Sequence, residues 1–226
     1  MTDPQTKINA LWNAASKEYD GQARHGVLDA REKAAWLAAL RGLLPPAPAD
    51  VVDVGTGTGM LALLISEMGH AVTGVDLAEE MLAQARAKAE AAGLAVRFEL
   101  GDAHEPPGAA GRVDVVISRH VFWTLTDPPR ALSNWRRLLR PGGRVVIIDG
   151  LWGASGTDDN RLGDIATSLP MMLADSLDQV RAVVEGAGFT GVAVSDLAEV
   201  ERIELELHGP PEDAEPRYVM VARKPA

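Results

Sequence analysis

The chain has 226 residues, 46% of them hydrophobic, and a formal net charge of −10. That size allows one domain or two small ones with a substantial core, and the acidic balance disfavours a general affinity for nucleic acids or anionic membranes, which need a concentrated positive field. The chain lacks cysteine, which excludes disulfides, thiolate metal sites and cysteine nucleophiles. Its polar N-terminal stretch has no signal-peptide core and no apolar run approaches a membrane span, so we expect a cytoplasmic protein.

Two helices are predicted before the first strand. One covers residues 3–16, and the other covers residues 29–44 and opens with Asp29 and Glu32 in the spacing of a capping box. Together they are expected to form a helical cap over residues 1–47.

An apolar strand is predicted over residues 50–54, and it runs directly into three glycines at alternate positions, Gly55, Gly57 and Gly59. An apolar helix over residues 60–69 follows the glycines. A strand, a turn without side chains and a helix N-terminus are together typical of a nucleotide or cofactor cradle.

Strands and helices alternate after this turn. In chain order the sequence predicts a strand at 71–76, a helix at 78–93, strands at 95–102 and 112–120, a helix at 126–143, a strand at 144–150, a helix at 176–189 and strands at 190–196 and 217–224. The helix at 126–143 is expected to stop at Pro141 and Gly142, and Ser176 and Gln179 have capping-box spacing.

The alternation predicts an α/β fold with a doubly wound, mostly parallel sheet. Three segments interrupt it, at residues 104–111, 151–172 and 208–216, and the middle one is long enough to form a lid or part of a substrate pocket. Nothing marks a second domain. A single domain over residues 1–226 is therefore predicted, with the cap at 1–47, a cofactor-binding half at 48–150 and a lid and substrate-side half at 151–226.

The glycine turn admits two kinds of cofactor. A nicotinamide-binding turn reads G-x-G-x-x-G and has an acidic residue about twenty positions further on. Here Asp76 does close the second strand, but the spacing is G-x-G-x-G, so the third glycine comes one residue early.

Five stretches in order carry a more specific resemblance. "VVDVGTGTG" resembles the cofactor-binding motif of class I S-adenosylmethionine-dependent methyltransferases of the small-molecule type, and "VDLAEEMLAQAR", "FELGDAHEPP" and "VDVVISRHVFWTLTDPPRAL" resemble the next three motifs. "WRRLLRPGGRVVIID" resembles the helix-to-strand corner of the same family. The order and spacing match from about residue 9 to residue 224. The resemblance implies a Rossmann-like methyltransferase fold with a seven-stranded sheet whose last strand is antiparallel, S-adenosyl-L-methionine as cofactor and S-adenosyl-L-homocysteine as product.

The resemblance also implies roles for individual residues. Asp53 would hold the ammonium group of the cofactor, Asp76 would bind both ribose hydroxyls, Asp102 with Ala103 would contact the adenine, and Tyr19 would close over the methionine end. An aspartate at a strand end also commonly caps the next helix, but placement at the carboxyl ends of consecutive parallel strands favours a ligand site. The expected cofactor-binding residues are Tyr19, Asp53, Gly55, Thr56, Gly57, Asp76, Leu77, Met81, Gly101, Asp102, Ala103, Ser118 and Arg119.

The acceptor side is expected after the fourth and fifth strands. His120 follows "VVISR", where the methyl group should lie, and its imidazole either removes a proton from the acceptor or only shapes the pocket. The candidate acceptor contacts are Phe122, Trp123, Asp149 and Trp152, and packing between elements is the alternative for the first two. His25 is expected to be an ordinary loop histidine. We expect no metal site, since Asp149 and the pair Asp158 and Asp159 offer the only material for one.

The expected function is methyl transfer from S-adenosylmethionine to a small-molecule acceptor, aromatic or heterocyclic, by in-line displacement. A protein or RNA acceptor is the alternative within the same fold. A nicotinamide-dependent oxidoreductase is a different class, disfavoured by the glycine spacing and by the lack of a Tyr-x-x-x-Lys pair. A non-catalytic protein that keeps the fold for assembly is the third possibility, and the intact acidic residues 53, 76 and 102 count against it. The expected partner is thus a small molecule rather than a nucleic acid or a membrane.

Overall fold

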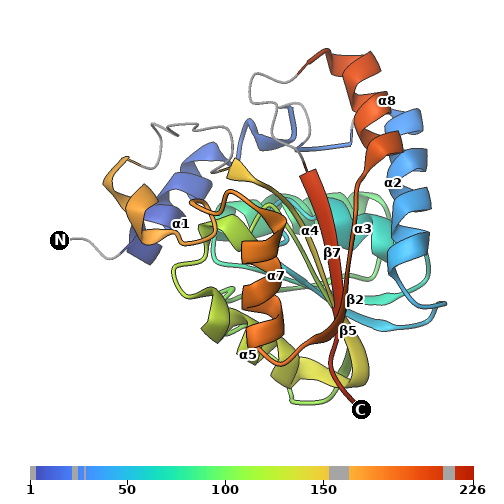
Figure 1. The fold of residues 1–226 in the computed structure, drawn as a ribbon. Coiled ribbons are helices and arrows are strands. Elements are labelled where there is room, and N and C mark those ends of the chain that lie inside the picture. Colours follow the sequence, from blue (N-terminus) through green and yellow to red (C-terminus); the bar gives the residue numbers. More distant parts are fainter. Residues whose placement is uncertain (1–3, 22–24, 28, 153–162, 211–216) are drawn as a thin grey trace.

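A computed structural model describes residues 4–21, 25–27, 29–152, 163–210 and 217–226. It shows a central twisted sheet with helices packed on both of its faces (Figure 1). The aspartate pair at 158 and 159, named above as possible material for a metal site, lies outside the described residues.

The described strands form one seven-stranded sheet in the order β3-β2-β1-β4-β5-β7-β6. The strands are β1 (Asp50–Val54), β2 (Ala71–Asp76), β3 (Arg97–Leu100), β4 (Val113–Arg119), β5 (Leu139–Gly150), β6 (Thr190–Ser195) and β7 (Arg217–Arg223). The first five strands pair in parallel, whereas β7 runs antiparallel to both of its neighbours, β5 and β6. The predicted fold class, a mostly parallel seven-stranded sheet with an antiparallel last strand, is confirmed.

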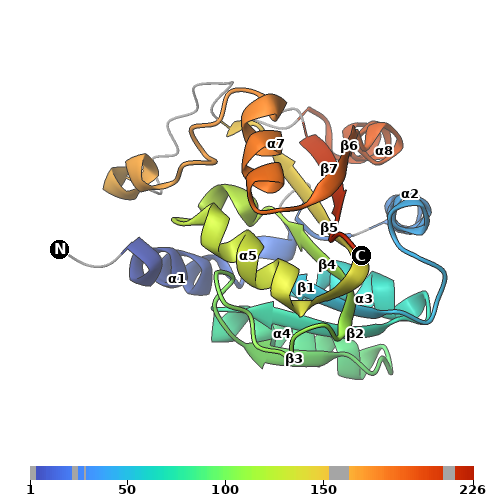
Figure 2. The same ribbon diagram turned by 60° about the horizontal axis from the view of Figure 1, so that its bottom comes forward.

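Helices cover the two faces because buried strand residues alternate between two cores. The helices are α1 (Pro4–Ala15), α2 (Ala30–Leu43), α3 (Met60–Glu67), α4 (Glu79–Ala91), α5 (Pro128–Leu138), α7 (Leu177–Gly186) and α8 (Ala198–His208), with short 3-10 turns η1 (Tyr19–Gly21), η2 (Phe122–Thr124) and η3 (Gly163–Ser168). Helices α5 and α7 share one core with Val116 of β4, and α2, α3 and α8 share the other with Val115 and Ile117 (Figure 2). In the described part of the chain, no helix combines the length and the apolar character that a bilayer crossing needs.

Helix α1 and η3 lie against each other beyond one end of the sheet (Figure 1). They share a third, small core, in which Ile8 of α1 and Ile165 of η3 pack with Trp123, Leu169 and Met172. The N-terminal cap, through α1, and the segment predicted as a lid, through η3, therefore pack against each other near the point where β4 and β5 end.

The corner between α5 and β5 differs from the sequence prediction. The helix was expected to reach Pro141 and Gly142, but it ends at Leu138 and the strand begins at once with Leu139. Backbone pairing explains the difference, because Gly142 N donates to Lys224 O at 3.0 Å and Lys224 N donates to Gly143 O at 2.8 Å. Sheet hydrogen bonds on this segment thus outweigh the turn preference of its proline and glycines.

The two predicted capping boxes have different outcomes. Asp29 is the N-cap of α2, since its carboxylate accepts a hydrogen bond from Arg31 N at 2.8 Å. Ser176 occupies the N-cap position of α7 but makes no side-chain capping bond. Gln179 Oε1 accepts from Asp175 N at 3.0 Å rather than from Ser176 N, so the predicted capping box at this helix is wrong in both halves.

Helix α8 was not predicted. Its apolar residues Val200, Ile203 and Leu207 recur at helical spacing and face the second core. The residues between them are mostly acidic, and no element was predicted for residues 197–207.

Candidate active site

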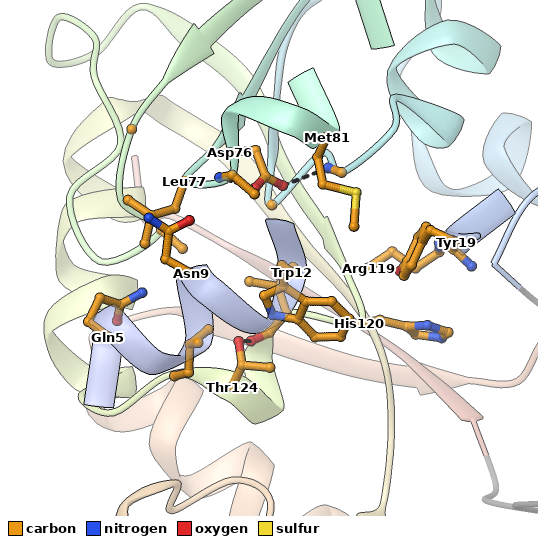
Figure 3. Close-up of a pocket in the computed structure, with 17 residues that line it drawn as sticks. Gln5, Asn9, Trp12, Tyr19, Asp76, Leu77, Met81, Arg119, His120 and Thr124 are labelled. Atoms are coloured by element: carbon orange, nitrogen blue, oxygen red, sulfur yellow. Dashed lines mark hydrogen bonds between the residues drawn. The ribbon is translucent and has the colours of Figure 1, made fainter. Parts of the chain in front are cut away.

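A cavity lies at the carboxyl ends of the parallel strands, between the sheet and α1 (Figure 3). The space it encloses, including the part open to solvent, is about 630 Å³. It is lined by Gln5, Ile8, Asn9, Trp12, Tyr19, Gly55, Gly57, Asp76, Leu77, Ala78, Met81, Gly101, Ala103, Arg119, His120, Val121 and Thr124. A smaller adjoining cavity shares Tyr19, Gly55, Gly57 and Arg119 and reaches Asp53, Thr56 and Thr58.

The glycine turn after β1 forms the floor of both cavities. Gly55 and Gly57 have φ angles of +67° and +55°, a conformation that favours glycine. A Cβ on Gly55 would lie 2.1 Å from Val121 Cγ2, so this glycine allows the chain after β4 to approach. A Cβ on Gly57 would meet only Tyr19 Cε1, at 4.0 Å. Gly57 therefore leaves open space above the turn, as a cofactor cradle requires.

Asp76 stands at the end of β2, directly beside this turn. Its Oδ2 accepts from Gly57 N at 2.7 Å and its Oδ1 accepts from Ala78 N at 2.9 Å. Burial raises the pKa of this carboxyl above its usual range, while the backbone N–H groups act in the opposite direction. Each carboxylate oxygen has a further lone pair, so Asp76 can accept additional hydrogen bonds from a ligand in the cavity.

Asp53 is the buried carboxyl of the smaller cavity. Only 2% of the residue is exposed, and its Oδ2 accepts from Thr56 Oγ1 at 2.7 Å. Burial raises the pKa of Asp53 to about 6. A cationic group next to it would favour the ionised form and be held by it.

Arg119 and Tyr19 form the wall shared by the two cavities. Arg119 Nη2 donates to His25 O at 2.7 Å, and its guanidinium carbon lies 5.6 Å from the centroid of the Trp36 ring. Burial lowers the pKa of Arg119, yet a guanidinium remains charged in proteins. Burial also raises the pKa of the Tyr19 hydroxyl. A positive charge and a neutral phenol thus lie side by side at this end.

Asp102 is positioned differently from Asp53 and Asp76. Its Oδ1 accepts from His104 N at 2.9 Å and lies 2.8 Å from His104 Nδ1, and this hydrogen bonding lowers the pKa of Asp102. The neighbouring Gly101 and Ala103 line the cavity, whereas Asp102 itself does not. The structure therefore places Asp102 at the rim, tied to His104.

His120 follows β4 and lines the cavity. Its φ of +56° is unusual for a residue with a side chain, and its backbone N–H donates to Ile148 O at 2.9 Å. The imidazole meets the rings of His25 and Trp152 edge-on, with centroids 6.1 and 6.3 Å away. Ser118, two residues earlier, is completely buried within β4 and does not reach the cavity.

The aromatic pair after His120 is divided between two environments. Phe122 is completely buried in the core under α5, with its ring 6.3 Å from that of Trp135. Trp123 belongs to the small core of the cap, and its indole N–H donates to His120 O at 3.1 Å. Trp152 lies against Trp123, with ring centroids 5.4 Å apart. Packing thus accounts for the position of Phe122, while Trp123 and Trp152 lie next to His120.

Asp149 ends β5 beneath these tryptophans. It is 1% exposed and accepts from Trp123 N at 3.1 Å, Gly150 N at 2.9 Å and Trp152 Nε1 at 3.2 Å. Burial raises the pKa of Asp149 to about 7. Its carboxylate holds the turn after β4 and the Trp152 indole, and it does not line the cavity.

Several cavity residues were not identified from the sequence, namely Gln5, Ile8, Asn9, Trp12, Ala78, Val121 and Thr124. The four on α1 have a signal, because positions 5, 8, 9 and 12 share one helical face. Gln5 Oε1 is buried and makes no hydrogen bond with the described residues. Within those residues, no group of three or more histidine and acidic side chains is arranged to hold a metal ion.

A model of the methyltransferase domain family matches residues 52–147. The chain is 44% identical over 108 residues to a demethylmenaquinone methyltransferase of Thermus thermophilus, covering 47% of this chain and 49% of that protein. It is 31% identical over 185 residues to an arsenite methyltransferase of Halobacterium salinarum, covering 78% of this chain and 46% of that protein. The chain thus spans about half the length of these curated relatives.

Solved structures show the same fold. A phosphoethanolamine N-methyltransferase 2 of Haemonchus contortus, in complex with S-adenosyl-L-methionine, aligns with a TM-score of 0.73 at 21% identity over 100% of this chain and 61% of its own. The cyclase SpnF aligns with a TM-score of 0.73 at 18% identity over 97% of this chain and 95% of its own. Proteins named for different reactions therefore share this architecture, so the reaction must be argued from the site.

Proposed function

We propose that this chain transfers a methyl group from S-adenosylmethionine to a small-molecule acceptor. The premise is that residues 52–147 carry a methyltransferase domain of the class I, S-adenosylmethionine-dependent kind. One observation carries the proposal. The Asp76 carboxylate and the bare Gly57 turn are joined by a hydrogen bond of 2.7 Å and both line a cavity with open space above Gly57.

The residues of the cavity fit the three parts of the cofactor. The ribose hydroxyls would be held by Asp76, and the adenine would lie between Leu77 and Ala103, where Gln5 offers a buried amide oxygen. The ammonium group would pair with Asp53 in the smaller cavity. The cofactor would supply an electrophilic methyl group, and every other contribution would come from the protein.

The contribution of the protein is alignment and exclusion of water. Helix α1 covers the cavity with Ile8, Asn9 and Trp12. The helix is attached to α4 by Glu80 N, which donates to Asn13 Oδ1 at 3.2 Å, and the residue after the helix is attached by Gln84 Nε2, which donates to Ser16 O at 2.7 Å. His120 lies at the end of β4, where it can remove a proton from the acceptor or shape its pocket. This enclosure favours a small acceptor over a protein or RNA, which would need an open groove.

The nicotinamide alternative has less support. Asp76 would suit a ribose in either cofactor, so it does not distinguish them. Gly59 packs against α4, where a Cβ would lie 3.0 Å from Ala85 Cβ. It follows Gly57 by two residues, one fewer than the third glycine of a nicotinamide turn requires.

Calorimetric titration distinguishes these two cofactor classes. We expect saturable binding of S-adenosylmethionine and S-adenosylhomocysteine, and no binding of NADH at the same concentrations. Tight binding of NADH with none of S-adenosylhomocysteine would refute the proposed function.

A further inference from the structure

Six aromatic side chains beside the cavity form a closed ring. Each is in contact with the next in the order Tyr19, Trp12, Trp123, Trp152, His120, His25 and back to Tyr19. The separations of neighbouring centroids run from 4.4 Å, between the stacked rings of Tyr19 and His25, to 6.4 Å, between Trp12 and Trp123. We call this set the aromatic ring.

Three separate segments build the aromatic ring. Trp12, Tyr19 and His25 come from the N-terminal cap, and the others come from the turns after β4 and β5. Arg119 connects the ring to the cofactor cavity, because its guanidinium donates to His25 O at 2.7 Å. In Figure 3, Tyr19 and His120 lie with Arg119 at one end of the cavity, away from Gln5, Asn9 and Leu77. The ring therefore borders the end of the cavity opposite the proposed adenine position.

We propose that the aromatic ring is the acceptor subsite and that it selects a flat, uncharged aromatic molecule carrying a hydroxyl group. This inference rests on the proposed function and narrows it. Flat aromatic molecules gain from edge and face contacts with surrounding rings, and Trp12, Tyr19 and His120 present such rings to the cavity.

Aromatic side chains also attract cations, so the charges around the ring decide between the two ligand classes. Arg119 supplies a buried positive charge directly against Tyr19 and His25. A second positive charge at this end, such as a protonated amine, would be repelled by it.

The Asp149 carboxylate does not compensate for this repulsion. Asp149 accepts hydrogen bonds from Trp123 N, Gly150 N and Trp152 Nε1, and like these two tryptophans it does not line the cavity. Its role toward the ring is positioning, because it fixes the Trp152 indole. Among the described residues, the one carboxylate that lines the cavity is Asp76, which the proposed function assigns to the ribose.

A hydroxyl acceptor also suits the two imidazoles of the ring. In the transfer, the acceptor oxygen forms a bond to the methyl carbon while the sulfur–carbon bond breaks, and that electron pair remains on sulfur as a thioether. The hydroxyl proton passes to the imidazole of His120, which lines the cavity, and then to water. Atoms and charge balance without any further reactant.

Ligand binding to the wild-type protein saturated with S-adenosylhomocysteine tests the proposal, with calorimetry as the readout. The probes are 2-naphthol, phenyltrimethylammonium as an aromatic cation, and cyclohexanol as a non-aromatic alcohol. We expect 2-naphthol to bind at least about tenfold more tightly than either of the others. Equal or tighter binding of phenyltrimethylammonium, or no saturable binding of 2-naphthol, would overturn the proposal.

Two variants of one residue locate the site. Trp152→Ala opens the ring, whereas Trp152→Phe keeps an aromatic face, and both lose the hydrogen bond to Asp149. We expect Trp152→Ala to weaken 2-naphthol binding about tenfold or more, and Trp152→Phe to stay within about threefold of wild type. S-adenosylhomocysteine affinity should be unchanged in both. Unchanged 2-naphthol binding in Trp152→Ala would place the acceptor elsewhere.

Failure of the two proposals is distinguishable. If the wild-type protein does not bind S-adenosylhomocysteine, the proposed function is wrong and the acceptor subsite falls with it. If S-adenosylhomocysteine binds but 2-naphthol shows no preference, only the acceptor inference is wrong. Should Trp152→Ala lose its fold, His25→Ala opens the ring from the other side, and the same loss of 2-naphthol binding is expected there.

Discussion

Asp53 is a carboxyl that the fold buries beside the proposed ammonium position, so cofactor binding should depend on pH. Its pKa is raised to about 6, and only the ionised form pairs with an ammonium group. Below pH 6 the carboxyl must first lose its proton, so affinity falls as the pH falls. We expect S-adenosylhomocysteine to bind about tenfold more weakly at pH 5 than at pH 7.5, measured by calorimetry. Asp53→Asn should bind weakly at both pH values, with this difference removed.

Asp76 offers the sharpest single test of the cofactor site. Asp76→Ala should weaken S-adenosylhomocysteine binding by about 2–4 kcal/mol, because two charge-assisted hydrogen bonds to the ribose are lost. Asp50→Ala is the matched control, since Asp50 lies at the opposite end of the neighbouring strand β1 and pairs with Arg140 at 2.7 Å. An Asp76→Ala protein with wild-type affinity would remove this carboxylate from the site.

At the scale of residues, the sequence predicts those parts of the site that follow from strand ends. Asp53, Gly57 and Asp76 stand where parallel strands stop, so their shared edge follows from the strand order. The hydrogen bond between the side chains of Asp102 and His104 could not be predicted in this way, because it depends on the path of the loop after β3. The same holds for His25, which the sequence places in an ordinary loop and the structure places against Tyr19 and His120.

The turn between β1 and α3 is the element on which cofactor access depends. Gly57→Ala should abolish S-adenosylhomocysteine binding while costing about 1 kcal/mol of stability, since a side chain would enter the open space above the turn at a positive φ. Gly93→Ala is the control, because Gly93 has a similar φ of +65° and a Cβ added there would meet no atom within 4 Å. It should lose similar stability in urea unfolding and bind normally.

The N-terminal cap is the element that completes the enclosure. Removing residues 1–28 should leave the sheet folded, because every described strand begins at or after Asp50 and α2 keeps Trp36 and Leu40 in the core. Turnover should nevertheless be lost, since the truncation removes Trp12 and Tyr19 from the cavity wall. Circular dichroism checks the fold and a methyl-transfer assay checks the activity. Normal turnover by the shortened protein would show that the cap is dispensable.

The bounds of a helix or strand could be predicted where its apolar periodicity agrees with the capping, glycine and proline residues at its ends. The span of α1, for example, matches its apolar and polar pattern within a residue or two. The end of α5 could not be predicted, because residues 139–143 belong to β5 and form backbone hydrogen bonds with a segment far along the chain. Such long-range pairing overrides local turn preference.

For the whole molecule, the carboxyls whose pKa is raised by burial, Asp53, Asp76 and Asp149, make the free energy of unfolding fall as the pH rises. Asp53 and Asp149 have pKa values raised to about 6 and about 7, so between pH 4 and pH 8 the folded state holds more protons than the unfolded state. The free energy of unfolding of the cofactor-free protein should therefore decrease over this window, by about 3–7 kcal/mol. Urea unfolding at several pH values measures it, and Asp149→Asn should flatten the upper part. Stability that rises from pH 5 to pH 8 would contradict the burial of these two charges.

We propose that residues 1–226 behave as one domain, in which residues 1–47 form the cap, 48–150 the cofactor-binding half and 151–226 the substrate-side half. Each part contributes side chains to a shared core. Trp36 of the cap packs with Ile65 of the first half and with Val200 of the second half. Ile8 packs with Trp123 and Leu169 in the third core.

The position of β7 has a consequence for how the protein is made. This strand lies between β5 and β6 and pairs with both, yet a ribosome produces it after the other six. Until residues 217–223 leave the exit tunnel, β6 has no strand beside it and β5 presents an open edge, which is a site for pairing with other chains. The nascent sheet therefore stays open between β5 and β6 until β7 inserts.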